Sequence, residues 1–380
     1  MKVLFIANSF FELTETFVHH QIKGATADKK ILVANEFKNE KFFALEDTEK
    51  YKIRLIPIHF IDRVVTKIKR MIADKRSYEY SVFNSLTLQK IIRTKNIDLI
   101  HAHFGPNGVR ALPIAKKAHV PLIVSFHGFD ASELMKKERY VEDLKDLFSY
   151  AKSIITVSKT LSKNLSPYVM SNKRIKIIPY GIDLDIFKGS SHEGTAIKIF
   201  HIGRLVRKKG VIELVEVFSS ILQEITQVEL HIVGDGPDLE QIRALIKQDS
   251  LENKVKLYGS RNHAEVINYF KEADIFVLNS RTSEKGDQEG LPNTILEAMA
   301  SGCAVLSTKH SGISEVIDEK NGVLVNERDQ NALRAELVRL IKNKELRANL
   351  GQTARSTAVH YFGLKHMNEE YAKIYREAVE

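Results

Sequence analysis

Residues 198–236 read KIFHIGRLVRKKGVIELVEVFSSILQEITQVELHIVGDG, and this stretch decides the fold. Its apolar runs Lys198–Ile202 and Val228–Val233 are short and rich in Val and Ile, which is typical of buried strands. Between them, Val211–Leu222 has apolar residues at helical spacing. A strand, a helix and a second strand in this order predict two parallel strands joined by a crossover helix.

The same alternation continues on both sides of this unit. The other expected strands are Lys2–Ala7, Lys30–Val33, Asp98–Ala102, Leu122–Phe126, Ser153–Val157, Lys254–Tyr258, Asp274–Leu278 and Ala304–Ser307. Further helices are expected at Leu239–Gln248, Ala264–Lys271 and Asn331–Lys342. The pattern predicts an α/β protein with two Rossmann-like, doubly wound parallel sheets, each covered by helices on both faces. Because such sheets bind ligands at the carboxyl ends of their strands, two of them facing each other predict a cleft between the domains.

The length of 380 residues fits two domains. A boundary is expected near residues 179–183, because residues 188–195 that follow are polar, contain glycine and have the composition of a linker. The expected domains are residues 1–183 and 184–361. Residues 362–380 are expected to form a last helix that packs back on the first domain.

The net charge of +9 is unevenly distributed along the chain. Residues 1–187 hold 31 Lys and Arg against 20 Asp and Glu, whereas the remainder holds 26 against 28. A basic half indicates an anionic partner, which is a membrane surface, a nucleic acid or a phosphorylated substrate. No stretch interleaves aromatic and basic residues in the manner that stacks bases, so we expect no nucleic-acid partner.

Cysteine content and hydropathy indicate a cytoplasmic protein. Cys303 is the single cysteine of the sequence, so no internal disulfide can form, and its apolar neighbours favour a core position. No run reaches the roughly 20 apolar residues that span a bilayer. Lys2–Ala7 is too short for a signal peptide and is read as a first strand.

Residues 61–76 have the pattern of a basic amphipathic helix, with six basic and two acidic residues. Two interpretations stay open. The helix either lies on an anionic membrane surface, which would place the protein peripherally on the inner face of the cell membrane, or buries its apolar side in the core.

The loop after Lys198–Ile202 has the chemistry of an anion site. Gly203 lets the backbone approach a ligand, and Arg204 and Lys209 stand just before a helix whose N-terminus attracts negative charge. These two cations are suited to hold a diphosphate. A solvated basic turn is the alternative.

Residues 289–302, EGLPNTILEAMASG, form the densest group of candidate site residues. Pro292 fits the start of a helix and Gly302 its end. The N–H groups of Gly290, Leu291, Asn293 and Thr294 lie at the positive end of that helix, where a phosphate or a sugar hydroxyl can accept from them. Glu289 and Glu297 can accept hydrogen bonds from sugar or ribose hydroxyls. The alternative is that Glu297 is only a favourable first-turn acid and Glu289 a surface residue.

Together these motifs resemble the donor domain of the retaining glycosyltransferases of family four, which have the GT-B architecture. The matching residues are Gly203-Arg204-Leu205, Lys208-Lys209-Gly210, Val233-Gly234-Asp235-Gly236-Pro237, Tyr258-Gly259, residues 273–280, the Glu289 to Glu297 segment, Ser311-Gly312-Ile313 with Glu315, and Asn321-Gly322. Within the family, residues 286–290 and Thr14-Glu15-Thr16-Phe17-Val18 resemble the bacterial exopolysaccharide subgroup of colanic-acid and amylovoran type.

The resemblance implies a role for each candidate residue. Arg204 and Lys209 would hold the donor diphosphate, Glu289 the transferred sugar with help from the backbone of Gly290 to Asn293, and Glu297 the ribose. Tyr258 and Arg261 would lie at the base. In the first domain, which would take the acceptor, His127 of Phe126-His127-Gly128-Phe129-Asp130 would touch the sugar. Glu15, Thr16 and Asp130 are expected near the acceptor. The glycine pair that many relatives carry after the first strand is replaced by residues 8–12, which puts a phosphate contact there in doubt.

The activity so implied is transfer of a sugar from a UDP- or GDP-linked donor to a lipid-linked or saccharide acceptor, with retention of configuration. No cofactor and no metal are expected, since no Asp-x-Asp lies in a metal-holding context. A nucleotide-sugar epimerase on the same plan and, less favoured, a basic nucleic-acid-binding protein are the alternatives.

Overall fold

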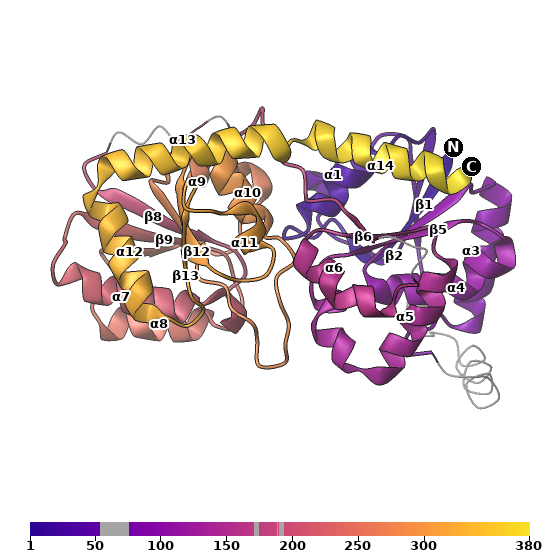
Figure 1. Cartoon of the computed structure of the whole chain (residues 1–380), viewed down its shortest axis with the longest axis horizontal. Helices are drawn as coiled ribbons and strands as arrows, with labels where there is room; N and C mark the ends of the chain where they lie inside the picture. Colours follow the sequence, from indigo (N-terminus) through magenta and orange to yellow (C-terminus); the bar gives the residue numbers. More distant parts are fainter. Residues whose placement is uncertain (54–75, 171–174, 188, 190–193) are drawn as a thin grey trace. The chain divides into compact units, whose positions relative to one another are not determined.

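The computed structural model describes residues 1–53, 76–170, 175–187, 189 and 194–380. Within it the chain divides into two compact units, Met1–Pro179 with Met367–Glu380, and Tyr180–His366 (Figure 1). This division falls close to the expected boundary after residue 183. Most of the expected linker, at positions 188 and 190–193, lies outside the described residues.

The first unit is built on a seven-stranded sheet in the order β3-β2-β1-β4-β5-β6-β7, and every neighbouring pair is parallel. Its strands are β1 (Lys2–Phe10), β2 (Lys29–Phe37), β3 (Thr48–Lys52), β4 (Leu99–His103), β5 (Leu122–Phe126), β6 (Ser153–Thr156) and β7 (Ile175–Ile177). The helices are α1 (Thr16–Gly24), α3 (Val82–Lys95), α4 (Gly105–Ala118), α5 (Glu138–Tyr150) and α6 (Lys159–Leu165), with most of α14 (Leu364–Val379). The strand order reverses between β1 and β4, which is the point where a doubly wound sheet opens its binding crevice.

The last helix belongs to the first unit from Met367 onward. Its Tyr375 is fully buried, and the hydroxyl lies 2.8 Å from His101 Nδ1 of β4 and accepts from Gln21 Nε2 of α1 at 3.1 Å. The helix is therefore fixed to the first unit by buried polar contacts as well as by apolar packing.

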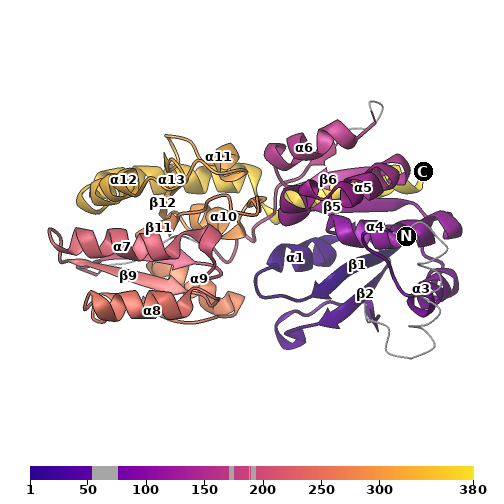
Figure 2. The same ribbon diagram turned by 90° about the horizontal axis from the view of Figure 1, so that it is seen from below.

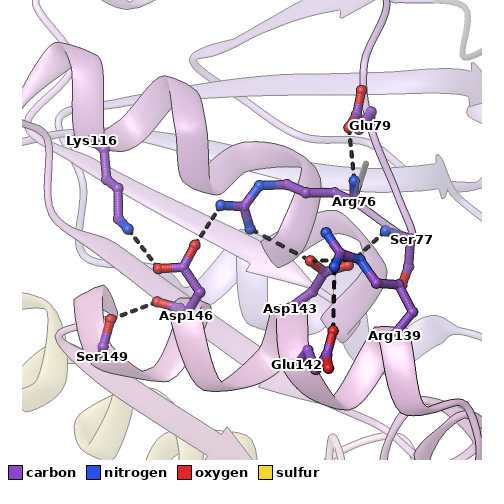
Figure 3. A network of polar contacts seen from close by, with 9 residues as sticks. All are labelled: Arg76, Ser77, Glu79, Lys116, Arg139, Glu142, Asp143, Asp146 and Ser149. Carbon is purple, nitrogen blue, oxygen red and sulfur yellow. Dashed lines mark hydrogen bonds and ion pairs between the residues drawn. The ribbon is translucent and has the colours of Figure 1, made fainter. Parts of the chain in front are cut away.

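The expected amphipathic helix at 61–76 lies, except for Arg76, outside the described residues. Arg76 and Ser77 form hydrogen bonds and ion pairs with α5 (Figure 3). Ser77 N donates to Asp143 Oδ2 at 2.6 Å, and Arg76 forms ion pairs with Asp143 and Asp146. Lys116 of α4 pairs with the same Asp146 at 2.7 Å. One carboxylate, that of Asp143, is only 4% exposed.

The second unit has a six-stranded parallel sheet in the order β10-β9-β8-β11-β12-β13. Its strands are β8 (Ile197–Ile202), β9 (Val228–Val233), β10 (Val255–Leu257), β11 (Ile275–Leu278), β12 (Ala304–Thr308) and β13 (Val323–Val325). The helices are α7 (Val211–Leu222), α8 (Leu239–Gln248), α9 (His263–Glu272), α10 (Asn293–Ala300), α11 (Ile313–Val316), α12 (Gln330–Lys342) and α13 (Lys344–Tyr361). The prediction of two Rossmann-like domains, each with a parallel sheet, is confirmed.

Helix α7 shows why this unit folds as it does. It packs against α8 and α12 (Figure 2) and buries Leu214, Val215 and Phe218 completely. An isolated helix of this length is only marginally stable. Burial of each such side chain contributes about 1.5–3 kcal/mol, so packing of this helix face stabilises α7. The strands that precede and follow α7 are thereby held in the sheet, and the loops at their carboxyl ends are placed together.

Candidate functional site

The loops after β8 and β9 approach each other too closely for side chains. Gly234 has φ +148°, and a Cβ at this position would lie 1.8 Å from the Gly203 carbonyl oxygen. A Cβ on Gly236, with φ +157°, would lie 2.4 Å from the Leu205 oxygen. Leu205 N in turn donates to Asp235 O at 2.9 Å. The second loop thus fixes the path of the first, which carries the candidate anion site.

The turn that presents Lys209 is held by the loop after β11. Gly210 has φ +63°, and a Cβ there would lie 2.2 Å from the Asn279 carbonyl oxygen. Asn279 Nδ2 donates to Gly210 O at 3.2 Å. Lys209 lies in this turn, just before α7, and is 8% exposed.

Lys209 and Glu289 form an ion pair, with Nζ 3.0 Å from Oε1. Lys208 Nζ lies 3.6 Å from the same carboxylate and 2.7 Å from Asp287 Oδ2. Burial alone would raise the pKa of Glu289, but the charges of Lys209 and Lys208 outweigh it and lower the pKa to about 2. Glu289 is therefore an ionised hydrogen-bond acceptor at neutral pH and not a proton donor.

The peptide groups of Glu289 are also held. Its N–H donates to His310 Nε2 at 3.0 Å, and Ser311 Oγ donates to its carbonyl oxygen at 2.6 Å. His310 Nδ1 lies 2.6 Å from Glu327 Oε1. These contacts join the loops after β11, β12 and β13 around one residue.

Helix α10 begins at Asn293, and Pro292 occupies its N-cap position without a side-chain cap. Gly290, Leu291 and Pro292 are buried, whereas Asn293 and Thr294 are half-buried. An uncapped helix start next to Lys209 and Glu289 has the polarity that attracts an anion.

Glu297 is buried, at 3% exposure, and does not lie on the surface of the protein. His263 Nε2, at the start of α9, lies 3.1 Å from Glu297 Oε1. Burial by itself would lower the pKa of His263, but its hydrogen bond with Glu297 raises it. A ribose hydroxyl that bound Glu297 would share this carboxylate with His263.

The remaining donor-side candidates follow β8 and β10 at the same edge of the sheet. Arg204 is exposed, and no carboxylate in the described part of the chain lies within ion-pair distance of it. The Tyr258 hydroxyl lies 2.8 Å from His231 Nδ1, and its ring contacts that of Tyr269 with centroids 4.7 Å apart. Arg261 pairs with Glu265 at 3.6 Å. Contact of Tyr258 and Arg261 with a base stays a prediction.

In the first unit, His127 follows β5 within a column of three imidazoles. The rings of His101 and His103 are stacked with centroids 4.7 Å apart, and His103 Nδ1 lies 3.3 Å from His127 Nε2. Burial lowers the pKa of His103 to about 3, and burial with the neighbouring imidazoles lowers those of His101 and His127 well below the usual range. His127 is thus a neutral imidazole at the carboxyl edge of this sheet.

Asp130 holds the loop that carries His127. Its carboxylate is fully buried and accepts from the backbone N–H groups of Gly105, His127 and Gly128 at 2.9–3.0 Å. Burial raises the pKa of Asp130, although these three hydrogen bonds oppose the shift. Both oxygens are occupied within the protein, so a direct contact of Asp130 with an acceptor stays a prediction.

Glu15 and Thr16 lie at the start of α1, and Thr16 is buried. The ring of the next residue, Phe17, lies 4.8 Å from that of His127. The structure therefore brings the start of α1 and His127, which are far apart in the sequence, to one edge of the first sheet. The acceptor-side roles of Glu15 and Thr16 stay predictions.

Comparison with known proteins assigns the family. Residues 183–357 match the model described as "Glycosyl transferases group 1", and residues 39–186 match "Glycosyltransferase Family 4". The chain is also 31% identical to WcaL of Escherichia coli, named as a colanic acid biosynthesis glycosyltransferase, over 73% of this chain and 70% of that protein. The chain belongs to the group 1, family 4 glycosyltransferases. The expected resemblance to this family and to its exopolysaccharide subgroup is confirmed.

This glycosyltransferase is similar to others of the subgroup and of the fold. The amylovoran biosynthesis glycosyltransferase AmsK of Erwinia amylovora is 34% identical over 64% of the chain and 61% of AmsK. The crystal structure of Anabaena HepE in complex with UDP and glucose superimposes with a TM-score of 0.81 over 99% of each chain at 18% identity. The glycosyltransferase therefore has the GT-B fold.

Several site residues of the glycosyltransferase escaped the sequence-based prediction. Lys208 adjoins Lys209 in one basic run, and His310 directly precedes the Ser311-Gly312-Ile313 motif, so both had a local signal. His263 and Glu327 had no local signal, because their partners are 34 and 17 residues away in the sequence.

No helix of the part that the structure describes is long and apolar enough to cross a membrane.

Proposed function

We propose that this glycosyltransferase moves a sugar from a nucleoside-diphosphate sugar to a saccharide or lipid-linked acceptor, with retention of configuration, in the synthesis of a bacterial exopolysaccharide or cell-surface glycan. The observation that carries the proposal is the buried Lys209–Glu289 pair beside the uncapped start of α10. A fixed cation and the positive end of a helix suit a diphosphate, and an ionised carboxylate beside them suits sugar hydroxyls.

UDP is the nucleotide that we propose to test first. HepE has been crystallised with UDP, with UDP-glucose and with UDP and glucose, and Staphylococcus aureus TarM with UDP. These ligands belong to those proteins. Their support for this chain lies in the shared fold, so GDP-linked sugars stay in the comparison.

In the proposed reaction, the bond between the sugar C1 and the diphosphate oxygen breaks as the acceptor oxygen bonds to C1 on the same face. The acceptor proton passes to a diphosphate oxygen. Arg204, Lys209 and the N–H groups at the start of α10 stabilise the negative charge that grows on the leaving group, which favours the transition state over the ground state. Glu289 orients the sugar. Its low pKa does not fit a general acid, and its ion pairs with two lysines do not fit a nucleophile. No metal and no cofactor take part in this scheme.

We further propose that the enzyme works at the inner face of the cell membrane. The support is the basic pattern of residues 61–76 in the sequence. Co-sedimentation with liposomes should increase with the fraction of anionic lipid, and binding that ignores the lipid charge would contradict this placement.

The experiment that tests the activity is a thermal-shift panel of UDP-glucose, UDP-galactose, UDP-N-acetylglucosamine and GDP-mannose, followed by mass spectrometry of products on lipid-linked acceptors. The proposal expects one sugar to stabilise the protein and to appear on an acceptor. Free epimerised sugar formed without an acceptor would instead identify an epimerase, and no stabilisation by any member would contradict donor binding.

A further inference from the structure

Both backbone groups of Glu289 are hydrogen-bonded to side chains, and His310 is the side chain that binds its N–H. His310 Nε2 accepts from Glu289 N at 3.0 Å, and the His310 side chain is fully buried. On the other side of the ring, Nδ1 lies 2.6 Å from Glu327 Oε1. His310 follows β12 and Glu327 follows β13, so the loops after these two strands meet the loop after β11, which carries Glu289.

The hydrogen bonds assign the state of the ring. Glu289 N–H can only donate, so Nε2 carries a lone pair and no proton. The proton of a neutral imidazole must then be on Nδ1, where the Glu327 carboxylate accepts it. In an imidazolium, or in the tautomer protonated at Nε2, the N–H at Nε2 would face the N–H of Glu289, and no hydrogen bond could form between them.

Glu327 is itself held in place. It accepts from Thr282 N at 2.9 Å, and Thr282 belongs to the loop after β11 that also carries Glu289. Burial alone would raise the pKa of Glu327, but the hydrogen bonds from His310 and Thr282 outweigh it and lower the pKa. The carboxylate therefore stays an acceptor at neutral pH, and it selects the tautomer that His310 needs.

The effect on Glu289 is geometric. His310 binds the N–H of Glu289, and Ser311 binds its carbonyl oxygen at 2.6 Å. These two hydrogen bonds restrict the peptide planes before and after Glu289. Its side chain then meets Lys209 at 3.0 Å in one orientation. Groups that act on a transition state must be fixed before the reaction, and a displacement of about 1 Å costs on the order of 100-fold in rate.

From these contacts we propose that His310, oriented by Glu327, is a positioning residue that fixes Glu289 for the transferred sugar. The proposal rests on the proposed function, because it gives Glu289 a substrate. His310 itself touches no substrate and exchanges no proton in the reaction.

Two substitutions of the same residue separate positioning from general stability. His310→Gln places an amide oxygen near the position of Nε2, so it keeps an acceptor for Glu289 N and loses the contact with Glu327. His310→Asn reaches only as far as Nδ1, so it keeps the contact with Glu327 and leaves Glu289 N unpaired. Each variant is polar, and each gives up one hydrogen bond.

We expect His310→Asn to lower kcat/KM for the panel member that the parent turns over by roughly 10-fold to 100-fold, mainly through kcat, and His310→Gln by less than about 3-fold. The affinity for UDP alone, measured by calorimetry, should stay within about 3-fold of the parent in both, since Glu289 contacts the sugar and not the nucleotide in this scheme. Equal loss in the two variants, or loss confined to UDP affinity, would overturn the proposal.

A control on β12, the strand that precedes His310, is Ser307→Ala, which removes a buried hydroxyl that donates to Leu278 O at 2.6 Å. It should lower Tm to a similar degree as the His310 variants while kcat stays near that of the parent. A drop in kcat that follows Tm across all three variants would show that stability, and not position, accounts for the effect.

A measurement without substrate separates this proposal from the proposed function. In protein labelled with 15N-histidine, the signal missing from His310→Gln identifies His310. Its shifts should be those of a neutral ring protonated at Nδ1 at pH 7. A ring protonated at Nε2 or at both nitrogens would overturn the geometry, whereas failure of every nucleotide sugar to react would overturn only the substrate that we assign.

Discussion

Lys209 Nζ of the β8–α7 turn lies 3.0 Å from Glu289 Oε1 of the loop after β11, and both side chains are about nine-tenths buried. A second cation, Lys208 Nζ, lies 3.6 Å from the same Glu289 oxygen. The pair joins residues 80 positions apart at the carboxyl edge of the second sheet. Whatever binds there meets a site whose charges are already arranged.

This pair should be coupled energetically. In a double-mutant cycle of Lys209→Met and Glu289→Gln, we expect a coupling free energy of about 1–3 kcal/mol in denaturant unfolding, because the groups are desolvated and in contact. The matched control is Arg243–Glu240, also at 3.0 Å but with side chains 58% and 79% exposed. Solvent screening should hold its coupling below about 0.5 kcal/mol. Equal couplings in the two cycles would contradict a buried, preorganised pair.

The pH dependence of stability should show the low pKa of Glu289. Its pKa falls from the ordinary 4.5 to about 2 in the folded protein, so the stabilisation from its charge is complete above about pH 5 and is lost as pH falls from 4.5 toward 2. We expect the stability difference between the parent and Glu289→Gln to be constant from pH 8 to pH 5 and to narrow only below that range. A difference that already changes between pH 7 and pH 5 would refute the assignment.

Two glycines test the close approach of the β8 and β9 loops. Gly234→Ala sets a Cβ against the Gly203 oxygen and should destabilise the protein by about 3 kcal/mol or more. Gly259→Ala is the control, since Gly259 also has a positive φ, of +70°, but no atom within 4 Å of its added Cβ. Its cost should be only the left-handed strain of about 1–2 kcal/mol. Equal melting temperatures of the two variants would mean that the loops separate easily.

The attachment of Ser77 to α5 gives a test in the first unit (Figure 3). Asp143→Ala removes a carboxylate that is 4% exposed and accepts from Ser77 N, and should cost about 1.5–3 kcal/mol because a hydrogen bond to a charged, buried acceptor is lost. Glu142→Ala, one position earlier, breaks only an exposed pair with Arg139 and should cost less than about 1 kcal/mol. Urea unfolding of both variants measures the difference, and a similar cost for both would contradict a structural role for Asp143.

Much of the fold was predictable from local pattern, and the strands that were missed all lie at sheet edges. Strands rich in Val and Ile, such as Val228–Val233, appeared where alternation predicted them. Strand β3 was missed because Thr48–Lys52 is a charged edge strand, and β7 and β13 are edge strands of three residues that were also missed, although β10, of the same length, was predicted. Short or polar edge strands bury too little to leave a pattern in the sequence.

The site was predictable only as far as its motifs reach. Lys209 and Glu289 stand in recognisable local contexts, so their roles could be inferred from residue type and position. Their contact, and the attachment of Glu297 to His263, depend on which loops the sheet order places side by side. No property of a single stretch of sequence encodes that order.

The most direct test of the donor site is the kcat/KM of the parent and of Lys209→Met for the nucleotide sugar that the panel selects. Removal of one fixed cation from the leaving group should lower kcat/KM by about 100-fold to 1,000-fold. The free energy of unfolding should also fall, by about 1–3 kcal/mol, because the pair with Glu289 is lost, so circular dichroism at the assay temperature must show that the variant is folded. A Lys209→Met variant that transfers the sugar as fast as the parent would contradict the assignment of this edge of the second sheet to the donor diphosphate.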